Sequence, residues 1–212
     1  ICYRDHADPM QIVSGRPGRE TVHYEPPPSG QVVREMDRFL AWFAATTPEP
    51  GQAAPMDGLA RAALAHLWFE SIHPFADGNG RVGRAIVDMA IAQDQGHPLR
   101  LYSLSRQLLA ARTEYYDELN RAQRGSGDAS SWVAWFATQI ALACESTIAI
   151  VDRAIEKSRF WTRHAALPLK ERQRKVLQRL LDAGDGGFLG GLNAEKYMKL
   201  TGVSKATATR DL

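Results

Sequence analysis

The chain has 212 residues, of which 44% are hydrophobic and 24% are charged, and its formal net charge is +2. These values are typical of a soluble globular protein, and the length allows one good-sized domain together with a small one. The two cysteines, Cys2 and Cys144, lie far apart, which argues against a disulfide framework or a zinc site and favours a reducing compartment. There is no signal-peptide pattern, and no apolar run reads as long enough to span a bilayer. We therefore expect a cytoplasmic protein with no membrane partner.

Charge is distributed unevenly along the chain. Residues 1–155 carry a balance of −4, whereas residues 156–212 carry a balance of +6. A basic segment of this kind favours a second module with an anionic partner. A small segment with much exposed surface could carry the same charge without any partner, so charge alone leaves both interpretations open.

The first thirty residues predict a β-hairpin rather than a helix. Glycine and proline at 15–18 separate two apolar stretches, so we expect 11–14 to pair with 20–24. The three prolines at 26–28 cannot donate ladder hydrogen bonds and should end the pairing there.

The residues after the hairpin predict helices, because their apolar side chains recur at helical spacing. The first three helices are expected over Val32–Ala45, over Gly58–Ile72, and from about Gly80 to Gln93 with an end at Gly96 and Pro98. The stretch SLSRQLLAARTEYYDELNRAQ predicts one continuous helix capped by Ser103 or Ser105. A long helix capped by Ser130 or Ser131 follows it. The body is therefore expected to be all-α with one small hairpin.

A glycine-rich break at 182–191 separates this body from a different pattern. Beyond the break we expect a short helix, a tight turn at Gly202 and a helix that opens at Ser204. This order is typical of the start of a helix-turn-helix, whose second helix enters the DNA major groove. The groove or backbone would then be faced by Ser204, Lys205, Thr207 and Arg210. We divide the chain into a domain over 1–165 and a partial module over 166–212.

The stretch HPFADGNGRVGR connects two predicted helices and favours an anion. The first turn of a helix has unpaired backbone N–H groups and the positive end of the helix dipole. Gly78 and Gly80 lack Cβ atoms, so these N–H groups can approach a phosphate closely. Arg81 and Arg84 are three residues apart, share one helix face and match phosphate oxygens. This amount of positive charge favours a di- or triphosphate over a monophosphate.

The acid and the histidine of this stretch indicate the chemistry. Asp77 would repel a bare polyphosphate, but a divalent cation such as Mg²⁺ can bridge it to phosphate oxygens. His73 has an ordinary pKa of about 6.5 and can accept a proton at neutral pH, whereas Phe75 should anchor the loop in the core. These residues indicate attack of a hydroxyl on phosphorus. A metal hydrolase built on His66, His73 and Asp77 is an alternative, but it leaves both arginines unexplained.

The same stretch matches the Fic motif, H-x-F-x-[DE]-G-N-G-R-x-x-R, at every specified position, and the chain resembles Fic proteins from the hairpin to the long helix. Members of this family typically transfer AMP from ATP to a hydroxyl side chain of a target protein and release pyrophosphate. The resemblance implies that His73 deprotonates the target hydroxyl and that Asp77 holds Mg²⁺. It implies phosphate binding by Gly78, Asn79, Gly80, Arg81 and Arg84.

The resemblance extends to the target, the nucleoside and the C-terminal module. The family's flap, which clamps the target chain by β-augmentation, corresponds to the hairpin of about 11–25, at Thr21 and Val22. Adenine and ribose are expected near Tyr115, Tyr116 and Gln123, for which ordinary core packing is an equal alternative. The C-terminal segment resembles the winged-helix regions that some bacterial Fic proteins carry, so DNA is a candidate partner.

Several alternatives stay open at this point. The Fic body could sense a nucleotide in a transcription regulator, or the same site could remove AMP from a protein. Phosphotransfer ranks lower, because Gly80 leaves room for terminal phosphates where the relative that transfers phosphate has a lysine. Many Fic proteins carry an inhibitory helix, [ST]-x-x-x-E-[GN], whose glutamate pairs with the second motif arginine, here Arg84. No glutamate of this chain satisfies that pattern. Either the protein is unregulated or such a helix lies before Ile1. We favour the second, and we therefore expect a longer chain to be less active. Homo-oligomerisation is left open.

Overall fold

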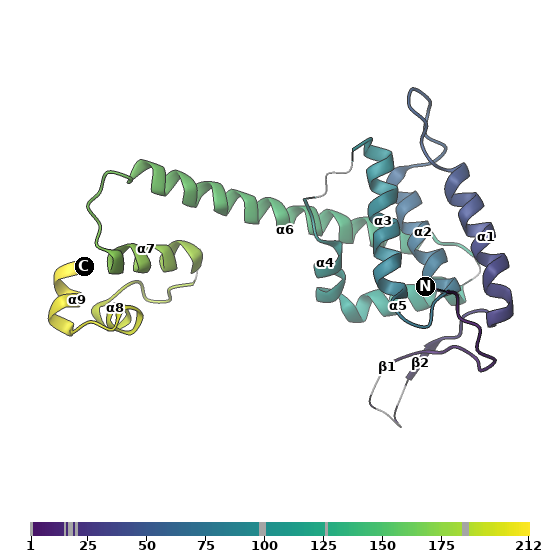
Figure 1. Cartoon of the computed structure of the whole chain (residues 1–212), viewed down its shortest axis with the longest axis horizontal. Coiled ribbons are helices and arrows are strands. Elements are labelled where there is room, and N and C mark those ends of the chain that lie inside the picture. The colour runs from purple at the N-terminus through teal and green to yellow at the C-terminus, as the bar shows by residue number, and fades with distance from the viewer. Residues whose placement is uncertain are drawn as a thin grey trace. The chain divides into compact units, whose positions relative to one another are not determined.

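The computed structural model describes residues 2–14, 16, 19, 21–97, 101–125, 127–183 and 187–212. The elements of this part of the chain are β1 (Ile12–Ser14), β2 (Thr21–Tyr24), α1 (Ser29–Ala45), α2 (Gly58–Ile72), α3 (Asn79–Gln95), α4 (Leu104–Ala110), α5 (Arg112–Arg124), α6 (Ser130–Arg163), α7 (Glu171–Ala183), α8 (Ala194–Thr201) and α9 (Lys205–Asp211) (Figure 1). The predicted all-α class with a small hairpin is confirmed. The chain divides within α6 into two compact units, Ile1–Thr147 and Ile148–Leu212. The predicted division after residue 165 stays a prediction.

The hairpin forms where the sequence predicts it. β1 and β2 are antiparallel, Val13 pairs with Val22, and the register is irregular just before Val13. The side chains of Val13 and Val22 are half exposed. Of the expected turn and strand start, Gly15, Pro17, Gly18 and Glu20 lie outside the described residues.

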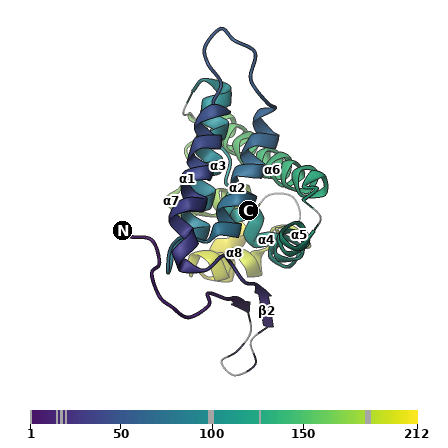
Figure 2. The same ribbon diagram turned by 90° about the vertical axis from the view of Figure 1, so that its right-hand side faces the viewer.

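The first unit is built around α2. This helix packs against α1 on one side and α3 on the other (Figure 1), and it also contacts α5. Figure 2 shows the same helices from the side of α1. The alanines of α2 at 62, 63 and 65 are fully buried and let the neighbouring helices approach closely. Asp57 begins the helix, because its side chain accepts a hydrogen bond of 2.9 Å from the Ala60 N–H. The packing of α2 against α3 holds the end of α2 close to the start of α3, where the loop between them lies.

Aromatic side chains fill the core between these helices. Phe39 of α1 and Phe69 of α2 are almost fully buried, with ring centroids 6.1 Å apart. Trp132 and Phe136 of α6 are buried with centroids 5.1 Å apart, and the Trp132 indole donates a hydrogen bond of 2.8 Å to the Ala63 carbonyl. Burying each such ring contributes about 1.5–3 kcal/mol. This core holds rigidly the helices that carry the loop described below.

Two sequence predictions about helix ends are wrong. The helix expected after Ser103 is two helices, because Ala111 leaves helical geometry (φ −96°, ψ 28°) between α4 and α5. The N–H of Ala111 still donates to the Gln107 carbonyl, so the bend needs no glycine or proline and has no local sequence signal. The long helix is not capped by a serine. It begins at Ser130, whose N–H donates to Asp128.

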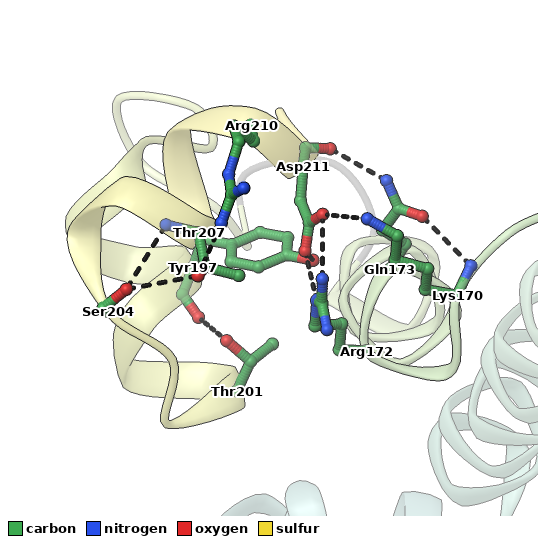
Figure 3. Close-up of polar contacts among 9 residues, drawn as sticks. All are labelled: Lys170, Arg172, Gln173, Tyr197, Thr201, Ser204, Thr207, Arg210 and Asp211. Carbon is green, nitrogen blue, oxygen red and sulfur yellow. Dashed lines mark hydrogen bonds and ion pairs between the residues drawn. The ribbon is translucent and has the colours of Figure 1, made fainter.

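The second unit contains the predicted short helix, turn and further helix. α8 ends at Gly202, whose left-handed conformation (φ 71°) turns the chain towards α9. The side chain of Asp211 in α9 is buried and accepts hydrogen bonds from Lys170 just before α7, from Arg172 of α7 and from the Tyr197 hydroxyl of α8 (Figure 3). This carboxylate therefore ties the three helices together. That the module is a winged helix stays a prediction.

One helix of the described chain, α6, is long and apolar enough to cross a membrane by length and composition alone. The expectation that no apolar run reaches this length is therefore wrong. Core helices of water-soluble proteins pass the same test, and the first turns of α6 bury Trp132, Phe136 and Ile140 in the core.

Candidate active site

The stretch HPFADGNGRVGR forms the turn from α2 into α3. α2 ends at His73, which is left-handed (φ 50°, ψ 59°), and α3 begins after Gly78 (φ 90°). His73 is the only non-glycine residue with positive φ in the part of the chain that the structure describes. A left-handed residue with a Cβ costs about 1–2 kcal/mol. Contacts around the loop must therefore hold His73 in place.

Asn79 closes this loop with its side chain. Its Oδ1 accepts a hydrogen bond of 2.9 Å from the Phe75 N–H, and its Nδ2 donates one of 2.7 Å to the Phe75 carbonyl. The Phe75 ring packs against the core, with its centroid 6.2 Å from that of Phe69. Asn79 is buried, and its side-chain amide is occupied by the two hydrogen bonds within the loop. Any contact of Asn79 with a ligand would therefore be made by its backbone.

A cavity of about 290 Å³ opens at the N-terminus of α3. It is lined by His73, Ala76, Asp77, Gly78, Asn79, Gly80, Arg81 and Arg84. The loop residues predicted from the sequence thus lie together. A Cβ at Gly78 would come within 3.2 Å of Arg81 Nη2, and one at Gly80 within 3.1 Å of Arg84 Nη1. The two glycines therefore leave room for the guanidinium groups as well as for a ligand.

The two arginines differ in their surroundings. Arg81 Nη2 lies 3.1 Å from Asp77 Oδ2, and both side chains are largely exposed. Such an exposed pair contributes little in water and can separate readily. Arg84 has no hydrogen bond or ion pair to another described residue, and it lines the cavity. Its guanidinium is therefore available to an anion.

His73 has the properties of a general base. Burial lowers its pKa, contact with the Glu70 backbone raises it, and the charge of Arg4 lowers it. The imidazole is therefore neutral at neutral pH, as a proton acceptor must be. Its Nδ1 is buried and lies 3.7 Å from Glu70 Oε2, so Nε2 is the nitrogen left to act on a substrate.

Behind His73 lies the carboxyl group of Glu70, in the last turn of α2. This side chain is 4% exposed, and its burial raises the pKa to about 7 against the opposing charge of Arg84. Its Oε1 has no hydrogen-bond partner among the residues described. Burial thus favours the neutral form of Glu70, and the side chain lies where it can influence both His73 and Arg84.

His66 belongs to the core rather than to the cavity. It is fully buried, its Nε2 lies 3.0 Å from the Tyr115 hydroxyl, and burial lowers its pKa to about 4. No three His, Cys, Asp or Glu side chains of the described chain are grouped so as to hold a metal. The alternative metal site of His66, His73 and Asp77 is therefore not formed in this geometry.

The side chains predicted to hold adenine and ribose do not line the cavity. Tyr115 packs against the core with its hydroxyl on His66. The Tyr116 ring stacks on His23 of β2 at a centroid distance of 5.6 Å. Gln123 has a buried Nε2 without a hydrogen-bond partner in the described chain. A nucleoside at these residues stays a prediction.

The hairpin residues predicted to clamp a target lie on β2. Thr21 pairs through its backbone with Ser14, and Val22 is half exposed opposite Val13. The Arg124 guanidinium of α5 donates a hydrogen bond of 2.6 Å to the His23 carbonyl, which fastens this strand to the helical core. A target-binding role for Thr21 and Val22 stays a prediction.

Three residues beside the site were missed by sequence reasoning. Arg4 lies 69 residues before His73, and no motif includes it. Glu70 could have been found from its spacing, since it precedes His73 by three residues and shares its helix face. Gly83 could have been found as a glycine inside a helix, which often marks close packing. A Cβ at Gly83 would come within 2.5 Å of Glu70 Oε1.

The fold and the cavity define a helical domain with an anion site at a helix N-terminus and a neutral histidine beside it. Residues 2–91 match the model of the Fic/DOC family. The family resemblance inferred from the motif is therefore confirmed over these residues, which make up less than half of the chain.

Two relatives and one solved structure are similar to the chain. The chain is 31% identical over 121 residues to "Protein adenylyltransferase Fic" of Nematostella vectensis and 32% identical over 124 residues to the protein of that name from Culex quinquefasciatus. These matches cover 57% of the chain but 26% and 22% of the two relatives, so the chain spans about a quarter of their length. A crystal structure of a Fic family protein from Desulfovibrio desulfuricans G20 is similar in fold, with a TM-score of 0.57 and 22% identity, over 99% of this chain and 53% of that one.

Proposed function

We propose that this chain transfers AMP from ATP to a hydroxyl side chain of a protein. The observation that carries the proposal is the neutral His73 imidazole on a cavity lined by the first turn of α3 and by Arg84. The hydroxyl oxygen attacks the α-phosphorus, and its proton passes to His73. The bond from the α-phosphorus to the bridging oxygen breaks, and pyrophosphate leaves.

The charges around the cavity support a polyphosphate. The amides at the start of α3 and the guanidinium of Arg84 would stabilise the phosphate oxygens. Arg81 would join them once its exposed pair with Asp77 opens. Asp77 is the one carboxylate of the cavity lining, which fits Mg²⁺, an ion usually held by one or two carboxylates together with phosphates and water. Bound Mg²⁺ would neutralise phosphate charge.

Labelled ATP tests the proposal. The chain is incubated with candidate target proteins and either α-labelled or γ-labelled ATP. AMP transfer leaves protein label from the α-position only, whereas phosphotransfer leaves label from the γ-position only. Loss of AMP from a protein already modified would reveal the reverse reaction. Label from neither position, with ATP bound, would point to nucleotide sensing instead.

The hairpin is the proposed docking site for the target. Its short strands expose Val13 and Val22, and a two-stranded sheet has unpaired backbone groups at its edges. An extended target segment could pair with such an edge and bring its hydroxyl to His73. Val22→Pro should disrupt the strand edge and weaken target modification, while ATP binding stays unchanged.

We propose a second function for the second unit, binding to DNA. Its support is the geometry of α8 and α9, which are joined by a turn over residues 202–204. α9 exposes Lys205, Thr209 and Arg210. On the same helix the Thr207 hydroxyl lies 3.2 Å from that of Ser204 and 3.4 Å from the Arg210 guanidinium (Figure 3). These groups have the character of a surface that reads DNA.

The DNA proposal is tested by retention of duplex DNA on the full chain across a salt series. Affinity should fall steeply with salt, because neutralised phosphates release counterions. Lys205→Ala should weaken binding and reduce the salt slope by about one. No retention at low salt would contradict DNA binding and leave the unit as a protein-docking module.

A further inference from the structure

We infer that Arg4 is a positioning residue, which holds His73 in its left-handed conformation and ties the active-site loop, residues 73–78, to the base of the hairpin. The inference rests on the proposed role of His73 as general base. Arg4 lies in the segment before β1 and is 4% exposed. Arginine is almost never buried to this degree unless its donors are paired.

The first set of contacts joins Arg4 to the chain around His73. The backbone N–H of Arg4 donates a hydrogen bond of 2.9 Å to the Pro74 carbonyl. Its Nε donates one of 2.9 Å to the His73 carbonyl, and its Nη2 donates one of 3.2 Å to the Ile72 carbonyl. Arg4 thus holds three consecutive carbonyl groups, those of the residues on either side of His73 and that of His73 itself.

The second set of contacts joins Arg4 to the chain that follows β2. Its Nη1 donates a hydrogen bond of 3.1 Å to the Ser29 hydroxyl, and its Nη2 also donates to the Pro27 carbonyl. Ser29 is the first residue of α1, and Pro27 belongs to the proline run that ends the hairpin. One guanidinium therefore connects the active-site loop to the segment between the hairpin and α1.

These contacts explain how the loop keeps an unfavourable conformation. A left-handed residue with a Cβ costs about 1–2 kcal/mol and persists only where its surroundings determine it. Histidine adopts this conformation more often than most residues with a Cβ, but it lacks the freedom of glycine, so its surroundings must hold it there. The planar fork of arginine has five donors in fixed directions and can satisfy several carbonyls together, whereas lysine has one compact ammonium group.

The expected consequence is a loss of rate with little loss of nucleotide affinity. Arg4 does not line the cavity, and the anion-binding groups of α3 begin beyond the residues that Arg4 holds. Without Arg4, the His73 imidazole would no longer be held at the correct position. A misplacement of about 1 Å can cost on the order of a hundredfold in rate.

Arg4→Lys tests the inference, with Arg61→Lys as the matched control. Arg61 is fully buried and also holds a carbonyl and two hydroxyls, those of Phe43, Thr46 and Thr47, but at the end of α1. Both variants should lose thermal stability. Below both melting temperatures, Arg4→Lys should reduce kcat about tenfold to a hundredfold with the KM for ATP within about twofold, and Arg61→Lys should leave kcat unchanged.

Hydrogen exchange of the peptide that contains residues 70–78 gives a second readout, which needs no activity. It should be faster in Arg4→Lys and unchanged in Arg61→Lys. If Arg4→Lys does not fold, Ser29→Ala removes one partner of the guanidinium and should also speed exchange. The inference is overturned if folded Arg4→Lys exchanges hydrogen in this peptide at the wild-type rate. It is also overturned if exchange is faster but kcat is that of the wild type. A wild-type chain without AMP transfer contradicts the proposed function instead, and loop exchange still decides the role of Arg4.

Discussion

Gly83 of α3 lies directly against the buried carboxyl group of Glu70 in α2. A Cβ at position 83 would come within 2.5 Å of Glu70 Oε1 and 3.1 Å of His66 Nδ1. The two helices can approach this closely only because position 83 has no side chain. The spacing of α2 and α3, and with it the place of the active-site loop between them, therefore depends on one glycine.

Gly83→Ala should lower the free energy of unfolding by about 1–3 kcal/mol, because the added methyl group overpacks the interface. Urea denaturation measures the change. Gly30→Ala is the matched control, since nothing lies within 4 Å of a Cβ there and the residue is inside α1. That variant should gain about 0.5–1 kcal/mol. Equal stability of Gly83→Ala and the wild type would show that the interface can relax.

His73→Ala should abolish AMP transfer and leave ATP binding nearly intact. The imidazole takes the proton of the target hydroxyl, whereas the α3 amides and Arg84 supply the affinity. General-base catalysis contributes about 10²–10⁴-fold. Label transfer from ATP and calorimetric ATP binding measure the two effects. More than about a tenth of wild-type transfer would exclude His73 as the base.

Arg84→Ala should raise the dissociation constant for ATP by about tenfold or more, because a hydrogen bond to a charged group contributes about 1.5–3 kcal/mol. Arg38→Ala is the control, since Arg38 is exposed and paired with Glu35 in α1. Calorimetric titration of both variants makes the comparison. Equal affinities in the two variants would place the phosphates away from Arg84.

Asp77→Asn should weaken the binding of Mg²⁺ that activity requires, because the amide keeps the size of the side chain and removes its charge. Half-saturation should move to higher Mg²⁺ concentration at fixed ATP. Titration of Mg²⁺ against label transfer measures the shift. An unchanged profile would mean that Asp77 serves only the loop, where its Oδ1 accepts the Gly78 N–H at 2.7 Å.

Glu70 should make the stability of the protein fall as the pH rises from about 4.5 to about 7. Its pKa is raised to about 7, so its stabilising contribution is complete below about pH 4.5 and is lost as the pH rises through about 7. His66 acts in the opposite sense. Its pKa is lowered to about 4, so its contribution is complete above about pH 6.5 and is lost as the pH falls.

The two effects oppose each other between about pH 4.5 and 6.5, and Glu70 alone remains above that window. The groups that face Glu70 are the charged Arg84 and the titratable His66, His73 and Tyr115. Glu70→Gln should therefore flatten the fall in melting temperature between about pH 6.5 and 8. A wild-type melting temperature that is constant over this range would show that Glu70 is not buried as a neutral acid.

The sequence predicted the helices and the loop because their signals are local. Gly96 ends α3 in a left-handed conformation (φ 69°), as a glycine after a helix predicts. Gly78, Arg81 and Arg84 lie together in the cavity because all three belong to one stretch of twelve consecutive residues, so no long-range contact is needed to bring them together. The bend at Ala111 has no such signal, since its surroundings contain ordinary helix-forming residues and only the folded chain selects it.

The surroundings of His73 could not be predicted in the same way. Arg4 contacts it from 69 residues away, and a lone arginine in an irregular segment has no periodic pattern. The raised pKa of Glu70 comes from burial between α2 and α3, which is a property of the packed helices. A pattern in one sequence shows which face of each helix is apolar. It does not show which residues of different segments come into contact, and the contacts of Arg4 and Glu70 are of that kind.

The ring that Asn79 and Phe75 form has a consequence for the thermodynamics of ligand capture. Because both hydrogen bonds exist before any ligand arrives, the loop is ordered when the chain folds rather than when the ligand docks. Nucleotide association should then lack a slow rearrangement phase and a large unfavourable entropy of loop ordering. In Asn79→Ala the loop would become ordered only when the nucleotide binds. The affinity for the nucleotide would therefore fall, although the Asn79 side chain itself contacts no phosphate.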